Sequence, residues 1–111
     1  MQMTAKELHD VLDVTVARIL DAIHPDRIIL FGSRATGSSR PSSDFDILVI
    51  KDSQEPRFRR SAPLYRLLAD VPAEFDILVY TPAEVEEWAE VPQAFVTHAI
   101  RTGRVLYERA A

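Results

Sequence analysis

The sequence lacks several features that would assign it to a well-known class of protein. It contains no cysteine, which excludes disulfide bonds and thiolate metal sites. No apolar run is long enough to cross a membrane, and the N-terminus lacks the basic and apolar segments of a signal peptide. We therefore expect a cytoplasmic protein that has no association with membranes.

The chain also lacks an excess of basic residues. It has 13 lysines and arginines against 17 aspartates and glutamates, which gives a formal net charge of −4 at pH 7. General nucleic-acid binders carry the opposite balance, because they must neutralise phosphates. No direct contact with nucleic acid is therefore expected.

The length of 111 residues and the hydrophobic content of 47% predict one domain over residues 1–111 with an apolar core of its own. A domain of this size has little room for both a catalytic site and a large platform for a second substrate. Any substantial second substrate would then have to be presented by another protein.

The hydrophobic pattern alternates between helices and strands. Thr4 and Glu7 have the spacing of a capping box, and the helix that follows should end before Pro25. A second capping box at Thr81 and Glu84 begins a later helix, with Pro82 at its first position. We predict strands at 27–31, 44–50, 74–80 and 104–107, and further helices at 57–68 and 93–101, the last capped by Gly103. This order predicts an α+β (α/β-like) domain built on a small sheet.

One five-residue segment occurs twice. Residues 45–49 and 75–79 both read Phe-Asp-Ile-Leu-Val, and the 30 residues between their starts contain a predicted helix. Two parallel strands joined by a crossover have this arrangement, which would place Asp46 and Asp76 at the same level of the sheet. The apolar letters alone could be a coincidence between two buried strands. The shared aspartate is harder to explain, because a charge in a buried strand is costly unless it is paired or bound to a cation.

A third carboxylate lies close to the first of these strands. Asp44 and Asp46 are two residues apart, so their side chains should share one face of the strand with about 6.6 Å between their Cα atoms. Together with Asp76 they form a cluster of hard oxygen ligands, which suits Mg²⁺ or Mn²⁺ rather than zinc. Two such ions are the usual means of displacement at phosphorus. A solvated strand end is the alternative interpretation of the Asp-x-Asp pair taken alone.

The loop before this strand could hold phosphate. Gly32 and Ser33 follow a buried strand directly, where a glycine allows close backbone approach and a helical turn would direct N–H groups to the site. Arg34 and Arg40 lie in the same loop and could pair with a triphosphate. Judged alone, the loop could also be a simple turn with solvated arginines.

Taken together, these motifs resemble the minimal nucleotidyltransferase (MNT) family of the DNA polymerase β-like nucleotidyltransferase superfamily. The resemblance is carried by residues 31–37 (Phe-Gly-Ser-Arg-Ala-Thr-Gly), by residues 43–49 (Ser-Asp-Phe-Asp-Ile-Leu-Val), and by Asp76 in a third strand. It implies a polymerase β-palm-like fold, in which a small mixed β-sheet is flanked by helices. Thr36 is a departure, since many relatives carry arginine there, and a weaker grip on the phosphates would follow.

The resemblance also implies a reaction. Asp44, Asp46 and Asp76 would be the catalytic residues and would hold two Mg²⁺ ions, with Mn²⁺ as a possible substitute. Gly32 and Ser33 would hold the β- and γ-phosphates of ATP, and the nucleotide site would extend to Arg34, Arg40 and Ser43. A hydroxyl group would receive AMP and pyrophosphate would leave.

Stand-alone members of this family resemble the MntA-like antitoxins of HEPN/MNT toxin–antitoxin systems. By that resemblance the acceptor would be a tyrosine of a HEPN-domain ribonuclease toxin, bound as a hetero-oligomer. Two alternatives remain: a catalytic subunit that modifies a small molecule held by a separate helical subunit, and a non-catalytic nucleotide-binding antitoxin that acts by contact alone.

Other conspicuous residues have simpler interpretations. The three histidines have no metal-ligand spacing and are expected at the surface or in helix caps. Trp88 is interpreted as core packing, with a partner-docking face as the alternative. The arginines of the predicted helix 57–68 are interpreted as a solvated face or, alternatively, as the contact for an acidic or nucleic-acid-bearing partner: Arg57, Arg59, Arg60 and Arg66.

Overall fold

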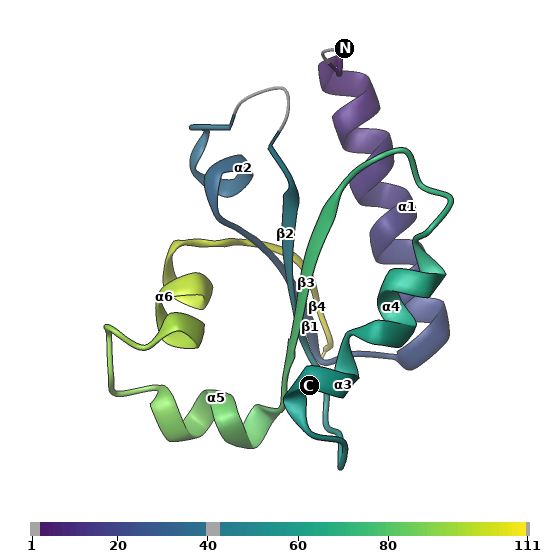
Figure 1. The fold of residues 1–111 in the computed structure, drawn as a ribbon. Helices are drawn as coiled ribbons and strands as arrows, with labels where there is room; N and C mark the ends of the chain where they lie inside the picture. Colours follow the sequence, from purple (N-terminus) through teal and green to yellow (C-terminus); the bar gives the residue numbers. More distant parts are fainter. Residues whose placement is uncertain (1–2, 40–42, 111) are drawn as a thin grey trace.

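The computed structural model describes residues 3–39 and 43–110 and shows a mixed four-stranded sheet flanked by helices (Figure 1). Its elements in chain order are α1 (Ala5–Ile23), β1 (Arg27–Phe31), α2 (Ser33–Thr36), β2 (Phe45–Ile50), α3 (Arg57–Arg60), α4 (Ala62–Leu67), β3 (Phe75–Tyr80), α5 (Pro82–Trp88), α6 (Phe95–Thr102) and β4 (Arg104–Glu108). The predicted α+β class is confirmed. No helix in the described part of the chain has the length and apolar character needed to span a bilayer.

The sheet has the strand order β3-β2-β1-β4. The strand β1 runs antiparallel to both β2 and β4, whereas β2 and β3 are parallel and are joined by the crossover that contains α3 and α4. The repeated segments pair in register, so that Asp46 lies beside Asp76. The prediction drawn from the repeat is therefore confirmed.

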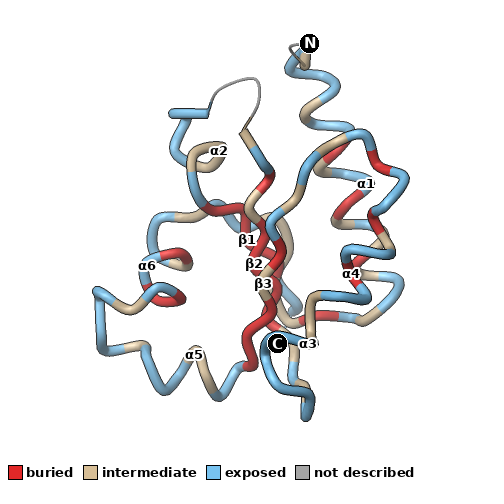
Figure 2. Tube along the Cα trace, in the orientation of Figure 1, coloured by how far each residue is buried: buried red, intermediate tan, exposed pale blue. Residues whose placement is uncertain are grey.

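Each face of the sheet is covered by its own pair of helices (Figures 1 and 2). On the first face α1 and α4 pack on the strands, and the second face is covered by α5 and α6. Because side chains alternate along a strand, Phe45 and Ile47 enter the first core, whereas Asp46 shares the second face with Leu48 and Ile50. Buried residues concentrate in the strands between these layers (Figure 2).

Both predicted capping boxes are present. The Thr4 hydroxyl accepts the Glu7 N–H while the Glu7 carboxylate accepts the Thr4 N–H, and Thr81 and Glu84 make the same exchange at the start of α5. At the other end of α1, His24 is the C-cap in the left-handed conformation. A capping role for a histidine is thus confirmed.

The single helix predicted over 57–68 is wrong, because the chain forms two short helices that meet at Ser61. Pro63 explains the break. A proline inside a helix removes an N–H donor and clashes with the carbonyl four residues earlier, but it is tolerated in a first turn. Pro63 accordingly lies in the first turn of α4.

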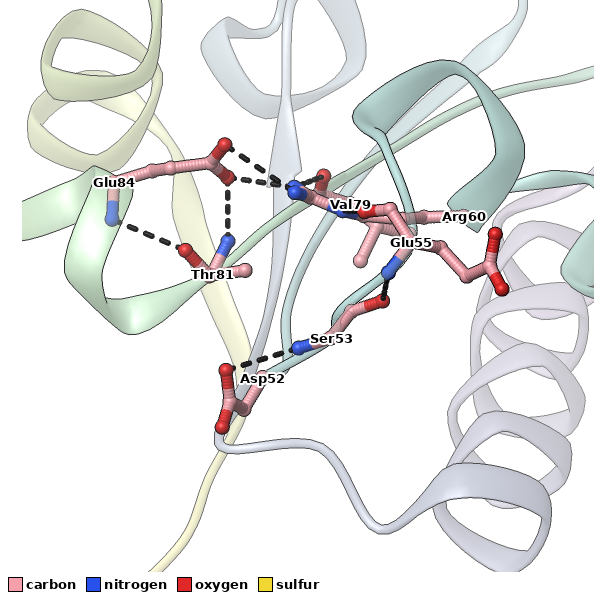
Figure 3. A network of polar contacts seen from close by, with 7 residues as sticks. All are labelled: Asp52, Ser53, Glu55, Arg60, Val79, Thr81 and Glu84. Atoms are coloured by element: carbon pink, nitrogen blue, oxygen red, sulfur yellow. Dashed lines mark hydrogen bonds and ion pairs between the residues drawn. The ribbon is translucent and has the colours of Figure 1, made fainter.

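The solvated-face interpretation is also wrong for Arg60, which lies within a network of polar contacts (Figure 3) and whose side chain is only 9% exposed. Its guanidinium donates to Glu84 Oε1 at 2.6 Å and to the backbone carbonyls of Glu55 and Val79. Glu84 also belongs to the capping box of α5. Arg60 therefore connects the loop after β2 with the end of β3 and the start of α5 through hydrogen bonds. Arg57, Arg59 and Arg66 are exposed, as predicted.

Gly103 ends α6, as predicted, but with extended rather than left-handed backbone (φ −79°, ψ 174°). A Cβ at this position would lie 2.5 Å from the Ala99 carbonyl oxygen and 2.8 Å from that of Leu30. The glycine is required here because α6 passes close to β1, and backbone flexibility is not the reason.

Core packing is the wrong interpretation of Trp88, which remains 44% exposed at the end of α5. Together with Tyr80 and Phe95 it lines a hollow of about 220 Å³ at the surface. The ring of Phe95 in turn packs edge-to-face on Phe31, with centroids 5.4 Å apart.

Candidate functional site

The candidate site is built on a row of residues from three adjacent strands. Phe31 of β1 pairs with Asp46 of β2, and Asp46 pairs with Asp76 of β3. Paired residues in neighbouring strands direct their side chains to the same face of a sheet. The two aspartates therefore lie side by side on the second face, close to the start of their strands.

Asp44 is placed differently from its prediction as a strand residue. The strand β2 begins at Phe45, so Asp44 is the last residue of the preceding loop and is exposed. It still belongs to the same electrostatic group, because its charge acts on Asp46. Asp46 is thus acted on by the charges of both Asp44 and Asp76.

Gly32 lies against this group. It has a positive φ of 72°, and a Cβ there would lie 2.2 Å from Asp46 Oδ2. No side chain fits between the two residues, and the backbone conformation also disfavours any residue with a Cβ. The sequence predicts close backbone approach at this glycine, and in the structure the group that it approaches is the carboxylate of Asp46.

The turn after Gly32 is the predicted helical turn, α2, which spans only Ser33–Thr36. The N–H groups of Ala35 and Thr36 donate to the Gly32 carbonyl at 3.1 and 3.3 Å. Phosphate contacts from this turn would therefore fall to the amide and hydroxyl of Ser33 and to the amide of Arg34. Ser33 is partly exposed beside the carboxylates.

The pKa of Asp46 is raised above the usual aspartate range. Burial is the largest cause, since it disfavours the charged form, and the negative charges of Asp76 and Asp44 follow; the positive charge of Arg34 acts in the opposite direction. A carboxylate with this environment is a candidate functional group, because its negative charge is unfavourable here and a bound cation would neutralise it.

The three aspartates, called the carboxylate row from here on, have donor atoms that fit a hard divalent cation. Asp44, Asp46 and Asp76 offer only carboxylate oxygens, the ligands that Mg²⁺ and Mn²⁺ prefer. Within residues 3–39 and 43–110, no three acidic or histidine side chains are drawn together into a ready-made metal cage. Asp44 and Asp76 are exposed, whereas Asp46 is partly buried.

Arg34 and Ser43, both predicted to bind nucleotide, lie together. The Arg34 side chain donates from Nε and Nη2 to the Ser43 carbonyl at 3.0 and 2.6 Å, and its guanidinium lies 4.3 Å from the centroid of the Phe45 ring. These contacts join α2 to Ser43, the residue before Asp44. The predicted site residue Arg40 lies outside the described residues.

A cavity of about 610 Å³ adjoins the row without containing it. Arg34, Ser43, Phe45, Tyr65 and Phe75 are among its lining residues, whereas the three aspartates are not. Phe45 belongs to the first-face core, so this cavity opens on the α4 side of the sheet. We therefore take the three aspartates, and not this cavity, as the candidate site.

One polar residue beside the site, Tyr65, is not predicted from the sequence. Tyr65 of α4 accepts the Ile77 N–H at 2.8 Å through its hydroxyl oxygen, and the same oxygen lies 3.5 Å from Asp76 Oδ1. Among Leu64, Leu67 and Leu68 this tyrosine reads as part of the apolar face of a helix. The only available signal was its hydroxyl group, which needs a hydrogen-bond partner when a tyrosine packs against a core.

Comparisons with known proteins show the family and the fold of the chain. The family described as "Polymerase beta, Nucleotidyltransferase" matches residues 15–111 of the chain. Among solved structures, the chain is similar to a protein from Sulfolobus solfataricus described as a candidate nucleotidyltransferase, with a TM-score of 0.66 and 17% sequence identity over 98% of this chain and 93% of the other. At that identity the likeness shows the fold alone. No curated protein matches the chain.

Proposed function

The chain belongs to the polymerase beta nucleotidyltransferase family, and from this premise we propose that it transfers AMP from ATP to a hydroxyl group of a partner protein. The observation that carries the proposal is the placement of Asp46 between Asp76 and the backbone of Gly32. A phosphate chain bound along Gly32 and Ser33 would lie directly beside carboxylates that can hold cations.

Each residue has a distinct task in the proposed reaction. Asp44, Asp46 and Asp76 would hold two Mg²⁺ ions, for which Mn²⁺ could substitute. When bound, such ions neutralise charge on the phosphates and align the attacking and leaving oxygens. Gly32 and Ser33 would hold the β- and γ-phosphates, so that the α-phosphorus faces the acceptor.

The balance of the transfer is simple. The acceptor oxygen forms a bond to the α-phosphorus of ATP, and the bond from that phosphorus to the bridging oxygen of the β-phosphate breaks. Pyrophosphate leaves with that oxygen. The proton of the acceptor hydroxyl passes to a carboxylate oxygen of Asp76, which lies at the exposed edge of the row.

We propose a protein acceptor because the described residues offer no separate lobe to hold one. The helices α1 and α4 cover one face of the sheet, and α5 and α6 cover the other (Figure 1). By the MNT resemblance the partner is a HEPN-domain toxin, the acceptor is one of its tyrosines, and the modification silences the toxin. The chain would then act as an antitoxin.

The test is incubation of the chain with Mg²⁺, ATP and the product of its neighbouring gene, the candidate partner, followed by intact mass measurement of both proteins. The expected result is addition of whole AMP units to the partner, lost with Asp44→Asn and with Asp46→Asn. Neutralisation of the partner that persists in both variants without added mass would indicate inhibition by contact. Pyrophosphate release that requires an added small alcohol, with the partner unmodified, would instead indicate a small-molecule transferase.

A further inference from the structure

Tyr65 contacts the outer edge of the sheet at the level of the carboxylate row. The strand β3 is an edge strand, so the N–H groups on its outer side have no neighbouring strand to accept them. The Tyr65 hydroxyl accepts one of them, the Ile77 N–H, at 2.8 Å. This bond fixes the phenolic oxygen immediately next to Asp76 in the chain.

The same hydroxyl has one proton of its own to donate. Since its oxygen already accepts from Ile77, the proton must be directed elsewhere, and Asp76 Oδ1 lies 3.5 Å away. The ring itself is held by its helix, because Leu64 and Leu68 on either side of Tyr65 in the sequence are buried in the first-face core. Packing of α4 thus determines where the hydroxyl lies.

We propose that Tyr65 is a positioning residue for Asp76. Its hydroxyl engages one carboxylate oxygen of Asp76, which directs the other oxygen toward Asp46 and the cation that the two residues would share. Outer contacts of this kind orient a metal-binding carboxylate and raise its effectiveness as a ligand. The inference rests on the proposed function, since it assigns Tyr65 a task only if the row holds a cation.

The size of the expected effect follows from the geometry. A separation of 3.5 Å is long for an O–H···O contact, whose usual range is about 2.5–3.0 Å. Loss of an outer contact to a metal ligand commonly weakens metal affinity by about 10–100-fold, and a long contact places Tyr65 at the lower end, about tenfold.

The variant Tyr65→Phe removes only the hydroxyl group from a side chain that is 40% exposed. Its matched control is Tyr107→Phe, which removes a hydroxyl from β4, the edge strand on the opposite side of the sheet. If Tyr65 merely closed the strand edge, its loss would lower stability and leave the affinity for a cation unchanged. Metal affinity therefore separates positioning from a purely structural task.

The experiment is a titration of the metal-free full chain with Mn²⁺, in which the free ion is followed by electron paramagnetic resonance. We expect the dissociation constant to rise about tenfold in Tyr65→Phe and to stay unchanged in Tyr107→Phe. In an Asp76→Asn background, Tyr65→Phe should have no further effect, because the two residues act as one unit. In the transfer assay, the Mg²⁺ concentration for half-maximal rate should rise by the same factor at saturating ATP.

The outcomes are distinguishable. If Mn²⁺ binding depends on Asp46 and Asp76 but is the same in Tyr65→Phe and wild type, the positioning role is wrong and the proposed function stands. An equal effect of Tyr65→Phe with and without Asp76 also overturns the role. If the wild type binds Mn²⁺ no better than Asp46→Asn does, the proposed function fails and this inference fails with it.

Discussion

The backbone of Gly32 touches the carboxylate of Asp46, so closely that a Cβ on Gly32 would lie 2.2 Å from Oδ2. The contact joins the end of β1 to the start of β2, two strands that also pair at this level through Phe31. The family motif has glycine at residue 32, and the local fold also requires glycine there. A side chain here would displace either the turn that follows Gly32 or the carboxylate of Asp46.

Gly32→Ala should abolish nucleotide transfer, and Gly37→Ala should not. Gly37 is left-handed (φ 80°, ψ 7°) and should cost about 1–2 kcal/mol of backbone strain as alanine, whereas Gly32 (φ 72°, ψ −156°) has a conformation essentially confined to glycine and should cost about 1–3 kcal/mol. Of the two, only the Cβ at position 32 meets an obstacle among the described residues, none of which lies within 4 Å of a Cβ at position 37. Transfer assays and urea denaturation of both variants test this difference. Equal activity in the two variants would contradict the close contact.

Asp46→Asn should make the metal-free protein more stable at neutral pH. The pKa of Asp46 is raised in the fold, so the folded state binds its proton more tightly than the unfolded state does. By linkage, Asp46 lowers the stability of the fold once the pH exceeds its unfolded pKa, and the full cost is reached above its folded pKa. The advantage of Asp46→Asn should therefore disappear as the pH falls below the ordinary aspartate range. Mg²⁺ should raise the Tm of the wild type and leave that of Asp46→Asn unchanged. Without metal, a wild type as stable as Asp46→Asn at pH 7 would contradict the prediction.

The row of carboxylates could be predicted because its determinants are local. The identical segments at 45–49 and 75–79 required no more than a crossover to place Asp46 and Asp76 at one level. The two capping boxes and the limits of β1 likewise depend on short-range patterns. Each of these features can be recognised from particular residue types at a fixed spacing in the sequence.

The contacts that the sequence did not reveal join residues far apart in the chain. Arg60 looked like one more solvated arginine, yet it is partly buried because Glu84, 24 positions later, lies within reach. Tyr65 looked like a core residue, because its partners on β3 follow from the way α4 lies along an edge strand. Such pairs depend on how helices dock on the sheet, which periodicity alone does not determine.

Arg60→Ala should destabilise the fold by about 2–3 kcal/mol, since it leaves Glu84 without its charged partner in a partly buried setting. Arg66→Ala, at an exposed position of α4, should change the stability by less than about 0.5 kcal/mol. The free energy of unfolding in urea gives both values. Similar losses in the two variants would show that the Arg60–Glu84 pair contributes nothing specific.

Glu84→Gln should lower the stability of the fold at neutral pH and make part of its loss of stability in acid disappear. The hydrogen bonds from Arg60 hold the pKa of Glu84 below its usual range, so the charged form stabilises the fold above the unfolded pKa. This contribution is lost as the pH falls through the lowered pKa. The stability gap between wild type and Glu84→Gln should be full at neutral pH and should close below about pH 4, near and under the ordinary value for glutamate. A gap that is independent of pH would contradict the pairing.

Gly103→Ala should cost about 1–3 kcal/mol through crowding alone. Its φ of −79° suits any residue, but a Cβ would meet two backbone carbonyl oxygens, those of Ala99 and Leu30, which cannot rotate away. Chemical denaturation measures the loss. A neutral substitution would mean that α6 can move away from β1 at no cost.

The most direct test of the site is a crystal structure of the chain with Mn²⁺ and a non-hydrolysable ATP analogue, in which anomalous scattering locates the metal. It decides whether Asp44, Asp46 and Asp76 form the metal and nucleotide site. Manganese should appear about 2.1–2.2 Å from carboxylate oxygens of Asp46 and Asp76, with the triphosphate along Gly32 and Ser33. Nucleotide and metal bound elsewhere, such as in the cavity beside Phe45 and Phe75, would contradict the assignment of the site and the reaction drawn from it.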